Sequence, residues 1–450
     1  MKRLLLVMIP VLMLFSCCHV CHTPASLPTK YIKDAAGRSV IYNGANICNA
    51  SKHCNQGRAG VSWEGPTELL AAKAEGRNVA RYLVFWEALE PTEGQFDTVY
   101  LKAAVAKAKE VIACSLDVIV DLHQDLFAQR YGGDGFPDWM VKDNGKSFKA
   151  NTENWALNYL QPAVLACFDN FWNDPKAQDK YARALKEFVK AFDTIPGVVG
   201  YDVMNEPFPG AMLPNVFEEG KLTAFYQKML ATIRESSSKL MFYEPWMSTS
   251  AGIQTYLKFK PDSLCVYAPH YYNLICESHG TYNIWNTGDM RCALKMKADE
   301  ARGFGVPMLL GEFGISDKSN RFYGYLMDFA GMADQYGFGW SYWSYDRLQE
   351  CDFGLMNNDG TVSQQALALR RTYPQRIAGD NPSWWFNGKK MSLSYTATGL
   401  KAPTVVFIPV TAKNVVISVN GTVVQKQQAG SPFVYQSEAT GPQLIEVTQE

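Results

Sequence analysis

The chain has 450 residues, of which 47% are hydrophobic and 19% are charged, and its formal net charge is −1. A chain of this length and apolar content can bury one large core together with a smaller second domain. Because it is nearly neutral and has no basic run beyond its first residues, it lacks the concentrated positive field that nucleic-acid binding requires. We therefore expect no nucleic-acid partner.

Residues 1–21 have the pattern of an export leader. The basic pair Lys2-Arg3 precedes an apolar run, Leu4 to Phe15, that is too short to cross a membrane comfortably. The alternative is an N-terminal anchor helix. The run leads into Leu14-Phe15-Ser16-Cys17, which is similar to a bacterial lipobox and would place a lipid on Cys17. We expect an exported protein, extracellular or at the cell surface, with lipoprotein anchoring through Cys17 left open.

Export would place the chain in an oxidising compartment, so we expect disulfide bonds. Three of the eleven cysteines lie in or just after the leader, which leaves eight in the mature chain. Two pairs are close in sequence and form natural loop-local bridges, Cys48 with Cys54 and Cys276 with Cys292.

From residue 40 onward, short apolar runs alternate with helical patterns, which favours a series of βα units. The runs expected to form strands are 40–47, 78–85, 116–122, 198–204, 239–243, 264–268, 307–311 and 339–345. The expected helices are 68–75, 99–112, 177–192, 217–237, 289–304, 321–336 and 364–371.

The run at 198–204 ends in Asn205-Glu206-Pro207 and is apolar at nearly every position, as expected of a strand covered on both faces. Pro207 lacks an N–H and disfavours helix at the residue before it, so the strand must stop there. Glu206 is then at the carboxyl end of a core strand, where burial would raise its pKa and suit a general acid. The alternative is a strand-end Glu that caps the next helix.

A second apolar run, Met308 to Gly311, ends in Glu312, which lies 106 positions after Glu206. This spacing leaves room for roughly three further βα units. Two carboxylates at strand ends are the minimum for glycoside hydrolysis, with one as acid/base and the other as nucleophile.

Four motifs taken in order resemble glycoside hydrolase family five, a retaining (β/α)₈ family: Asp121-Leu122-His123-Gln124-Asp125, Asn205-Glu206-Pro207, Gly311-Glu312-Phe313-Gly314 and Trp340-Ser341-Tyr342-Trp343. The His-Gln-Asp form of the first motif narrows the resemblance to the endoglycoceramidase group. Residues 132–137, the stretch 168–172 and a trailing β-domain point the same way. The resemblance covers roughly residues 35–450 and implies an α/β fold with a TIM barrel.

After Tyr373-Pro374 the composition shifts, and residues 392–447 alternate apolar and polar side chains. Asn420-Gly421 is a strong hairpin signal. We expect a catalytic domain at 22–377 followed by a small antiparallel β-sandwich domain at 378–450.

The resemblance implies that Glu206 is the acid/base and Glu312 the nucleophile. It places Arg81 beside the nucleophile and implies that a tyrosine after the sixth strand hydrogen-bonds Glu312. Tyr272 is chosen because it shares a face with His270. The expected substrate-binding residues are Lys52, Arg81, His123, Asp125, Trp172, Asn205, His270, Tyr272 and Trp343.

Each of these roles has a plainer alternative. Arg81 lies in an expected buried strand, where a cation is costly unless paired, so a structural salt bridge inside the barrel would also explain it. His123 and Asp125 lie two apart on one face, which also fits a structural His–Asp pair. Lys52 could be a solvated loop lysine, and most tryptophans, Trp172 among them, are simply core.

The loop after Glu206, residues 208–217, is unusually apolar and must lie on the catalytic face. Contiguous exposed apolar surface usually marks a binding site. We therefore hypothesise that Met212, Leu213 and Phe217 line a ceramide or micelle contact. The alternative is that this loop packs under the neighbouring insert.

Together these features predict an exported retaining β-glycosidase that needs no metal and no organic cofactor. The resemblance implies cleavage between oligosaccharide and ceramide, which the residues alone do not determine. We expect a monomer with a glycosphingolipid substrate and a transient contact with a membrane or micelle surface. The alternatives are a relative acting on monosaccharide ceramides, a family-five β-glucanase, and a non-enzymatic carbohydrate-binding protein, against which the two strand-end Glu residues argue.

Overall fold

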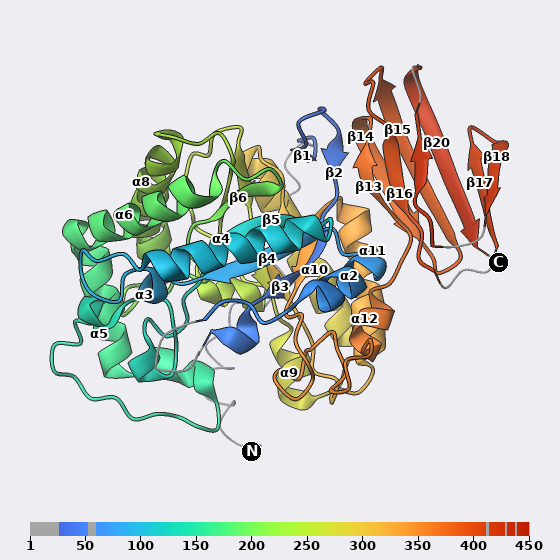
Figure 1. Cartoon of the computed structure of the whole chain (residues 1–450). Helices are drawn as coiled ribbons and strands as arrows, with labels where there is room; N and C mark the ends of the chain where they lie inside the picture. Colours follow the sequence, from blue (N-terminus) through green and yellow to red (C-terminus); the bar gives the residue numbers. More distant parts are fainter. Residues whose placement is uncertain (1–26, 53–59, 411–413, 428–429, 437–438, 450) are drawn as a thin grey trace.

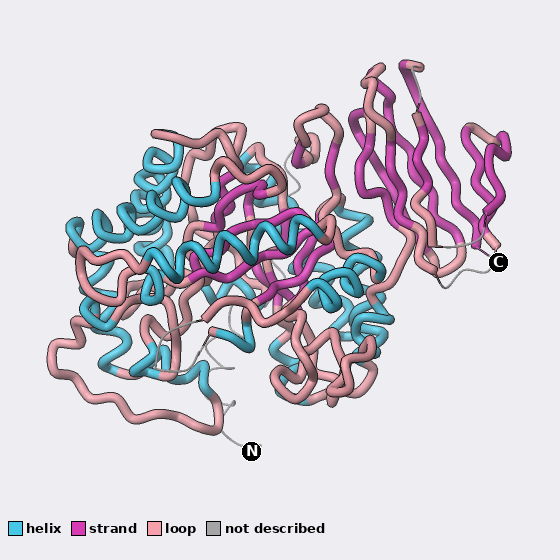
Figure 2. Tube along the Cα trace, in the orientation of Figure 1, coloured by secondary structure: helices cyan, strands magenta, loops and turns pink. Residues whose placement is uncertain are grey.

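The computed structural model describes residues 27–52, 60–410, 414–427, 430–436 and 439–449. Two bodies lie side by side (Figure 1): a large α/β body coloured from blue to light orange, and a body of orange and red strands that ends in the C-terminus. Figure 2 shows that strands form the centre of the large body and that helices and loops surround them.

Eight parallel strands form the centre of the large body, in the order β10-β12-β3-β4-β5-β6-β7-β8. A parallel bridge between Tyr267 of β8 and Met308 beside β10 joins the two ends of this order, which closes the barrel. The strands are β3 (Asn43–Ile47), β4 (Val79–Val84), β5 (Asp117–Leu122), β6 (Val198–Asp202), β7 (Leu240–Tyr243), β8 (Cys265–Tyr267), β10 (Leu309–Leu310) and β12 (Gly339–Tyr342). The predicted (β/α)₈ fold is confirmed.

Helices connect and cover these strands, and the longer ones present an apolar stripe to the barrel. The helix α6, for example, starts at a proline after the capping carboxylate of Asp174 and buries eight side chains, among them Leu185 and Phe188. The helices are α2 (Pro66–Ala74), α3 (Trp86–Leu89), α4 (Thr98–Ala113), α5 (Pro162–Asn173), α6 (Pro175–Phe192), α7 (Pro214–Val216), α8 (Thr223–Arg234), α9 (Leu274–His279), α10 (Ile284–Phe304), α11 (Phe322–Tyr336) and α12 (Gln364–Ala368).

Several helices differ from the prediction, among them α5 in the insert, which was not predicted, and two whose starts differ. The helix α10 begins at Ile284 rather than at 289, because Asn283 and Asn286 form a capping box that starts it earlier. The helix expected at 217–237 begins as a π-helical turn, Phe217–Leu222, and continues as α8.

The second body consists of two antiparallel five-stranded sheets, as the predicted β-sandwich requires. A continuous apolar core lies between them, with Trp384, Met391 and Leu393 from one sheet and Val406 and Phe433 from the other. The first sheet contains β1 (Ile32–Lys33), β2 (Ser39–Val40), β13 (Tyr373–Ile377), β16 (Thr404–Phe407) and β19 (Phe433–Tyr435). The second contains β14 (Gly379–Phe386), β15 (Lys390–Thr398), β20 (Thr440–Gln449), β17 (Val415–Val419) and β18 (Thr422–Gln427).

The N-terminal strands β1 and β2 belong to this sandwich and not to the barrel, which corrects the strand predicted at 40–47. Val40 pairs with Arg376 of β13, and the side chain of Ile41 lies in the sandwich core. The barrel therefore begins only at Asn43. A hydrogen bond from the Trp384 indole to Asp334 of α11, at 2.8 Å, also joins the two bodies.

The structure does not contain the predicted bridge between Cys276 and Cys292. Among the described residues the structure contains no disulfide bond; Cys276 is buried in α9, whereas Cys292 lies exposed on α10. Cys54 lies outside the described residues, as do the leader and Cys17, so the structure does not test those predictions.

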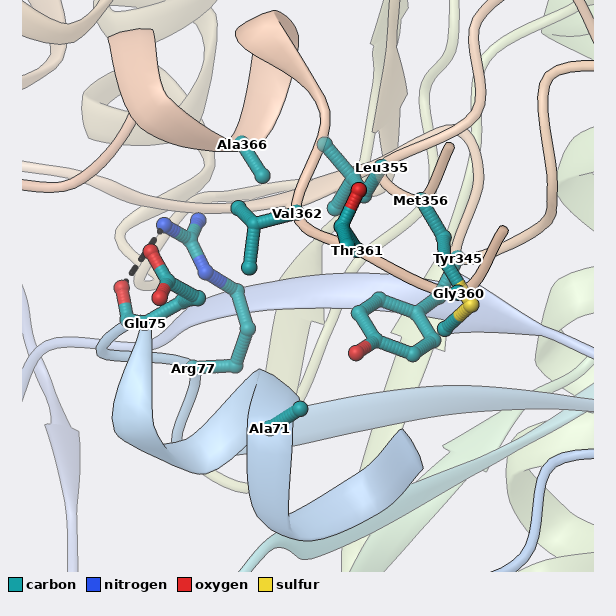
Figure 3. Close-up of a pocket in the computed structure, with 10 residues that line it drawn as sticks. All are labelled: Ala71, Glu75, Arg77, Tyr345, Leu355, Met356, Gly360, Thr361, Val362 and Ala366. Carbon is teal, nitrogen blue, oxygen red and sulfur yellow. Dashed lines mark hydrogen bonds between the residues drawn. The ribbon is translucent and has the colours of Figure 1, made fainter. Parts of the chain in front are cut away.

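No helix in the described part of the chain combines the length and apolar character needed to cross a lipid bilayer. One small cavity lies between α2 and the loop at 355–366, where Arg77 donates a hydrogen bond to the carbonyl oxygen of Glu75 (Figure 3). It encloses about 20 Å³, room for roughly one water molecule. None of the predicted site residues lines it, so it is not the substrate site.

Candidate active site

The carboxyl ends of two barrel strands, β6 and β10, bring both predicted catalytic carboxylates together on one face of the barrel. Glu206 lies four residues beyond the end of β6 at Asp202, and Glu312 lies in β11 (Glu312–Phe313), which follows β10 after Gly311. This strand pairs with β9 (His270–Tyr271), so that His270 lies opposite Glu312. A Cβ atom at Gly311 would come within 2.8 Å of the His270 imidazole, so glycine is needed for this close approach.

His270 lies between the two carboxylates. Its Nδ1 is 3.0 Å from Oε1 of Glu206 and 3.5 Å from Oε2 of Glu312. One oxygen of each carboxylate lies within 4.8 Å of the other. This separation is close to the 5–5.5 Å typical of retaining glycosidases and well below the 6.5–9.5 Å of inverting ones.

Glu206 is buried and its backbone is strained. Its φ of +40° lies in the left-handed region that side chains rarely adopt. The Gln124 amide donates to the carbonyl oxygens of Asn205 and Glu206, at 3.0 and 3.1 Å. Burial raises the pKa of Glu206 to about 7, against the opposing hydrogen bond and charge of His270. A carboxyl group with this pKa can give up and take back a proton near neutral pH.

Glu312 accepts two hydrogen bonds, one on each oxygen. Arg81 Nη1 donates to Oε1 at 2.8 Å, and the Tyr272 hydroxyl donates to Oε2 at 2.9 Å. Arg81, which was predicted to lie beside the nucleophile, and Tyr272, the tyrosine chosen from sequence, therefore both contact Glu312.

Arg81 projects from β4 into a buried cluster of carboxylates. Besides Glu312, its guanidinium lies within 3.1 Å of an oxygen of Asp121, Asp202 and Glu244. Burial by itself disfavours the charged guanidinium, but these carboxylates outweigh it and hold the pKa of Arg81 well above its ordinary value. The cluster fixes the cation that touches the predicted nucleophile.

A second polar group lines the neighbouring side of the site. Lys52 Nζ lies 2.6 Å from Oδ2 of Asp125 and 5.1 Å from the centre of the half-buried Trp343 ring. The His123 ring stacks on Trp343 with centroids 5.5 Å apart. Burial opposes the charge on His123, but Asp121 and Asp125 raise its pKa to about 10. Four of the predicted substrate-binding residues therefore form one connected group.

This geometry agrees with what comparison with known proteins finds. Residues 40–348 match the family model of cellulase, glycosyl hydrolase family 5. The chain belongs to this family.

Individual relatives align with most of the chain, including residues outside the family match. Endoglycoceramidase I of Rhodococcus hoagii is 27% identical over 410 residues, which span 84% of this chain and 78% of that protein. The structure of endo-glycoceramidase II from Rhodococcus sp. in complex with ganglioside GM3 has a TM-score of 0.84 at 26% identity, covering 94% of this chain and 100% of that one. Its lactosyl-enzyme intermediate has a TM-score of 0.81 at 26% identity, with the same coverage.

Two predicted site residues of this family 5 chain lie in its core. Trp172 is 1% exposed, donates its indole N–H to the carbonyl oxygen of Phe208 and packs edge-on against Phe217. It therefore has no open face for a sugar ring. Phe217 is fully buried in the same contact and cannot line a lipid surface. The alternative that the loop packs under the insert is correct for Phe217 and for the half-buried Met212, whereas Leu213 is 69% exposed.

Asn205 lies beside the acid/base candidate with both ends of its amide engaged. Its Oδ1 accepts from Arg81 at 3.0 Å, and its Nδ2 donates to the carbonyl oxygen of Gln124 at 3.1 Å. Its proposed contact with a sugar hydroxyl remains a prediction.

Sequence reasoning missed three buried carboxylates of this family 5 site, namely Asp121, Asp202 and Glu244. Asp121 and Asp202 interrupt otherwise apolar strands and pair across β5 and β6. Glu244 follows β7 as Tyr243-Glu244-Pro245, the same strand-then-Glu-Pro pattern that singled out Glu206. That repeated pattern was the available signal.

Proposed function

We propose that this chain is a retaining endo-β-glycosidase that cleaves the bond between oligosaccharide and ceramide in glycosphingolipids. The observation that carries the proposal is the pair Glu206 and Glu312, less than 5 Å apart at their nearest oxygens and bridged by His270. The likeness to endo-glycoceramidase II over 94% of the chain supports the substrate class.

In the first step, an oxygen of Glu312 attacks the anomeric carbon and forms a covalent glycosyl-enzyme. The bond from that carbon to the ceramide oxygen breaks, and Glu206 gives its proton to the leaving oxygen. Arg81 and Tyr272 hold the two oxygens of Glu312 and so aim the nucleophile. A protonated Glu206 is available near neutral pH because burial raises its pKa to about 7.

In the second step, water attacks the same carbon, Glu206 takes the proton of that water, and Glu312 leaves as a carboxylate. Two inversions at one carbon give net retention. After the first step Glu206 is an anion, and His270, at 3.0 Å from its Oε1, stabilises that form.

The group formed by Lys52, His123, Asp125 and Trp343 binds the sugar next to the cleaved bond. Lys52 and Asp125 offer a donor and acceptors for hydroxyl groups. The half-buried Trp343 ring gives a flat apolar surface for sugar C–H groups. This arrangement of one aromatic surface and several fixed polar groups is typical of small-ligand sites.

Ceramide carries long apolar chains, so the rim of the site must also meet lipid. Two loops that start beside the catalytic residues carry exposed apolar side chains, Leu213 and Val216 after Glu206, and Leu274 and Ile275 after Tyr272. We assign the transient contact with a membrane or micelle to these four residues, in place of Phe217. Exposed apolar side chains beside a catalytic site support a lipid contact.

The same proposal includes export through the leader at residues 1–21 and action as a monomer. The composition of the leader supports export. Size-exclusion chromatography with light scattering determines whether the mature protein is a monomer in solution. N-terminal sequencing of the secreted protein identifies the site where the leader is cleaved.

Thin-layer chromatography of ganglioside and glucosylceramide digests tests the proposed reaction. An intact oligosaccharide released from the ganglioside, together with free ceramide, is the expected result. Faster release of glucose from glucosylceramide would instead favour the monosaccharide-ceramide alternative. Digestion of cellulose oligomers with no action on either lipid would identify a β-glucanase.

A further inference from the structure

Glu244 is a buried carboxylate at the centre of the site that the two-step reaction leaves without a role. Its oxygens make three contacts with the catalytic groups. Oε1 accepts from Arg81 Nη2 at 2.9 Å and lies 3.2 Å from His270 Nε2, while Oε2 accepts the backbone N–H of Glu206 at 2.8 Å. One side chain thus touches the cation at the nucleophile, the imidazole between the two carboxylates and the peptide that carries the acid/base.

The contact with the backbone matters because Glu206 has a φ of +40°. A non-glycine residue in this region costs roughly 1–3 kcal/mol unless its surroundings hold it there. Glu244 holds the N–H of this residue and Gln124 holds its carbonyl oxygen. Together they set the direction in which the Glu206 side chain leaves the backbone.

The contact with the imidazole means that carboxylates lie at both nitrogens of the His270 ring. Nδ1 of His270 faces Glu206 and Glu312, and Nε2 faces Glu244. An imidazole with carboxylate oxygens near both nitrogens is favoured as the cation, which carries a proton on each nitrogen. Without Glu244, the anionic partner of Nε2 would be lost.

We propose that Glu244 is a positioning residue for the acid/base, which holds His270 as a charged donor to Glu206 and fixes the strained peptide that carries it. This inference rests on the proposed function, since it assigns Glu244 a task within the retaining reaction. In this proposal Glu244 acts through Arg81, His270 and Glu206 and does not contact the substrate.

The charged and titratable groups around His270 and Glu206 come from several elements. They are Arg81 from β4, Asp125 after β5, Asp202 from β6, Glu244 after β7, Tyr272 after β9 and Glu312 from β11. Burial opposes the charge on His270, but Glu244, followed by Glu312, raises the pKa of His270 well above its ordinary value. The charge of His270 in turn lowers the pKa of Glu206.

The variant Glu244→Gln tests this chain of effects. Glutamine keeps the shape and an acceptor for the Glu206 N–H but removes the negative charge. His270 should then hold its proton less firmly, and its charge should no longer oppose the raised pKa of Glu206. We expect the alkaline limb of kcat/KM to move upward by about one pH unit. An unmoved limb would overturn the proposal even if kcat fell.

A matched control is Glu218→Gln. Glu218 is also buried, and its oxygens accept backbone N–H groups of Trp246 and Tyr256. It contacts neither Arg81 nor His270 in any described hydrogen bond or ion pair. We expect this variant to lose stability without moving the alkaline limb. A shift of the limb in both variants would reduce the effect to general loosening and contradict the specific role.

A second readout needs no substrate and no active variant. In protein labelled with ¹⁵N-histidine, the signal assigned to His270 by its loss in His270→Asn should show both nitrogens protonated at about pH 8, above the ordinary histidine pKa of about 6.5. A neutral His270 ring in the wild-type protein would overturn the proposal. If the wild-type protein did not act on glycosphingolipids, the proposed function would fail while this spectrum still decided whether His270 is held as the cation that the proposal requires.

Discussion

Between the two sheets of the C-terminal sandwich the buried side chains are almost all apolar, among them Met391, Leu393 and Ile417. At the carboxyl end of the barrel strands the buried side chains are mostly charged, with Arg81 and His270 among five carboxylates. Apolar burial stabilises a fold directly, at about 25 cal/mol per Å². Buried charges lose hydration that their mutual attraction repays only in part.

This difference indicates that the sandwich core serves the stability of the fold, whereas the charged barrel cluster serves the reaction. The sandwich core can be explained by packing alone. The barrel cluster cannot, because a hydrophobic replacement of similar volume would often be equally stable or more so. We therefore assign the cluster to catalysis, and the predictions below separate the two regions by whether a change affects reaction or stability.

The largest expected effect is on reaction alone. Glu312→Gly should lower turnover of an aryl lactoside by several orders of magnitude, because no nucleophile remains. Azide should partly restore turnover and give the inverted glycosyl azide, which NMR of the product identifies. Activity that survives in the variant without azide would remove Glu312 from the mechanism.

The next effect depends on the leaving group. Glu206→Ala should lower the rate on ganglioside by about 10²–10⁴-fold, since general acid catalysis is worth this much. An aryl lactoside with a good leaving group needs less protonation and should lose less in the first step. Rates measured on both substrates, each with wild type as reference, check this; equal losses would contradict the acid role.

In the sandwich, a core change should act on stability instead. Ile417→Ala removes a fully buried side chain and should lower the free energy of unfolding by about 2–5 kcal/mol. Denaturant unfolding measures this change. Turnover per folded molecule and the pH profile should match wild type, and a change in either would show that the two regions are coupled.

The pH profile of the wild-type enzyme should reflect the charged region. The first step needs protonated Glu206, and burial raises the pKa of this group to about 7. The value of kcat/KM should therefore fall tenfold per pH unit above about pH 7. A limb near the ordinary glutamate pKa of about 4.3 would mean that Glu206 is not held as an acid.

The smallest effect is expected at the rim of the site, where Leu213 is exposed and contributes little to the stability of the fold. Leu213→Ser should weaken action on ganglioside micelles, by at most about 1.5–3 kcal/mol if lipid buries the side chain fully. The rate on a soluble aryl lactoside and the melting temperature should be unchanged. The matched control is Val423→Ser, at a residue of the sandwich that is 53% exposed. Equal changes on both substrates would remove Leu213 from the lipid contact.

The sequence predicts the barrel and its two carboxylates well because both depend on local pattern. Glu206 and Glu312 each end an apolar run, and a parallel strand buried on both faces must end where its chain turns polar. Arg81 is predicted for a similar reason, since a cation in such a strand needs a partner.

What the sequence does not predict depends on contacts between distant segments. Trp172 and Trp343 look alike as residues, yet Trp172 is buried against Phe217 and Trp343 is half-open beside Lys52. Val40 and Ile41 continue directly into β3 in the sequence, and only the pairing of Val40 with Arg376 places this start of the run in the sandwich. Such distinctions come from tertiary packing, which overrides local propensity.

The central claim is that Glu206 and Glu312 together release an intact oligosaccharide with retention. Proton NMR of ganglioside GM3 during digestion tests it most directly, because the anomeric signal of the sugar at the cleaved bond is observed before mutarotation. We predict that the β-anomer of the intact oligosaccharide appears first, with free ceramide. Initial release of the α-anomer, or of single sugars from the outer end, would contradict the claim.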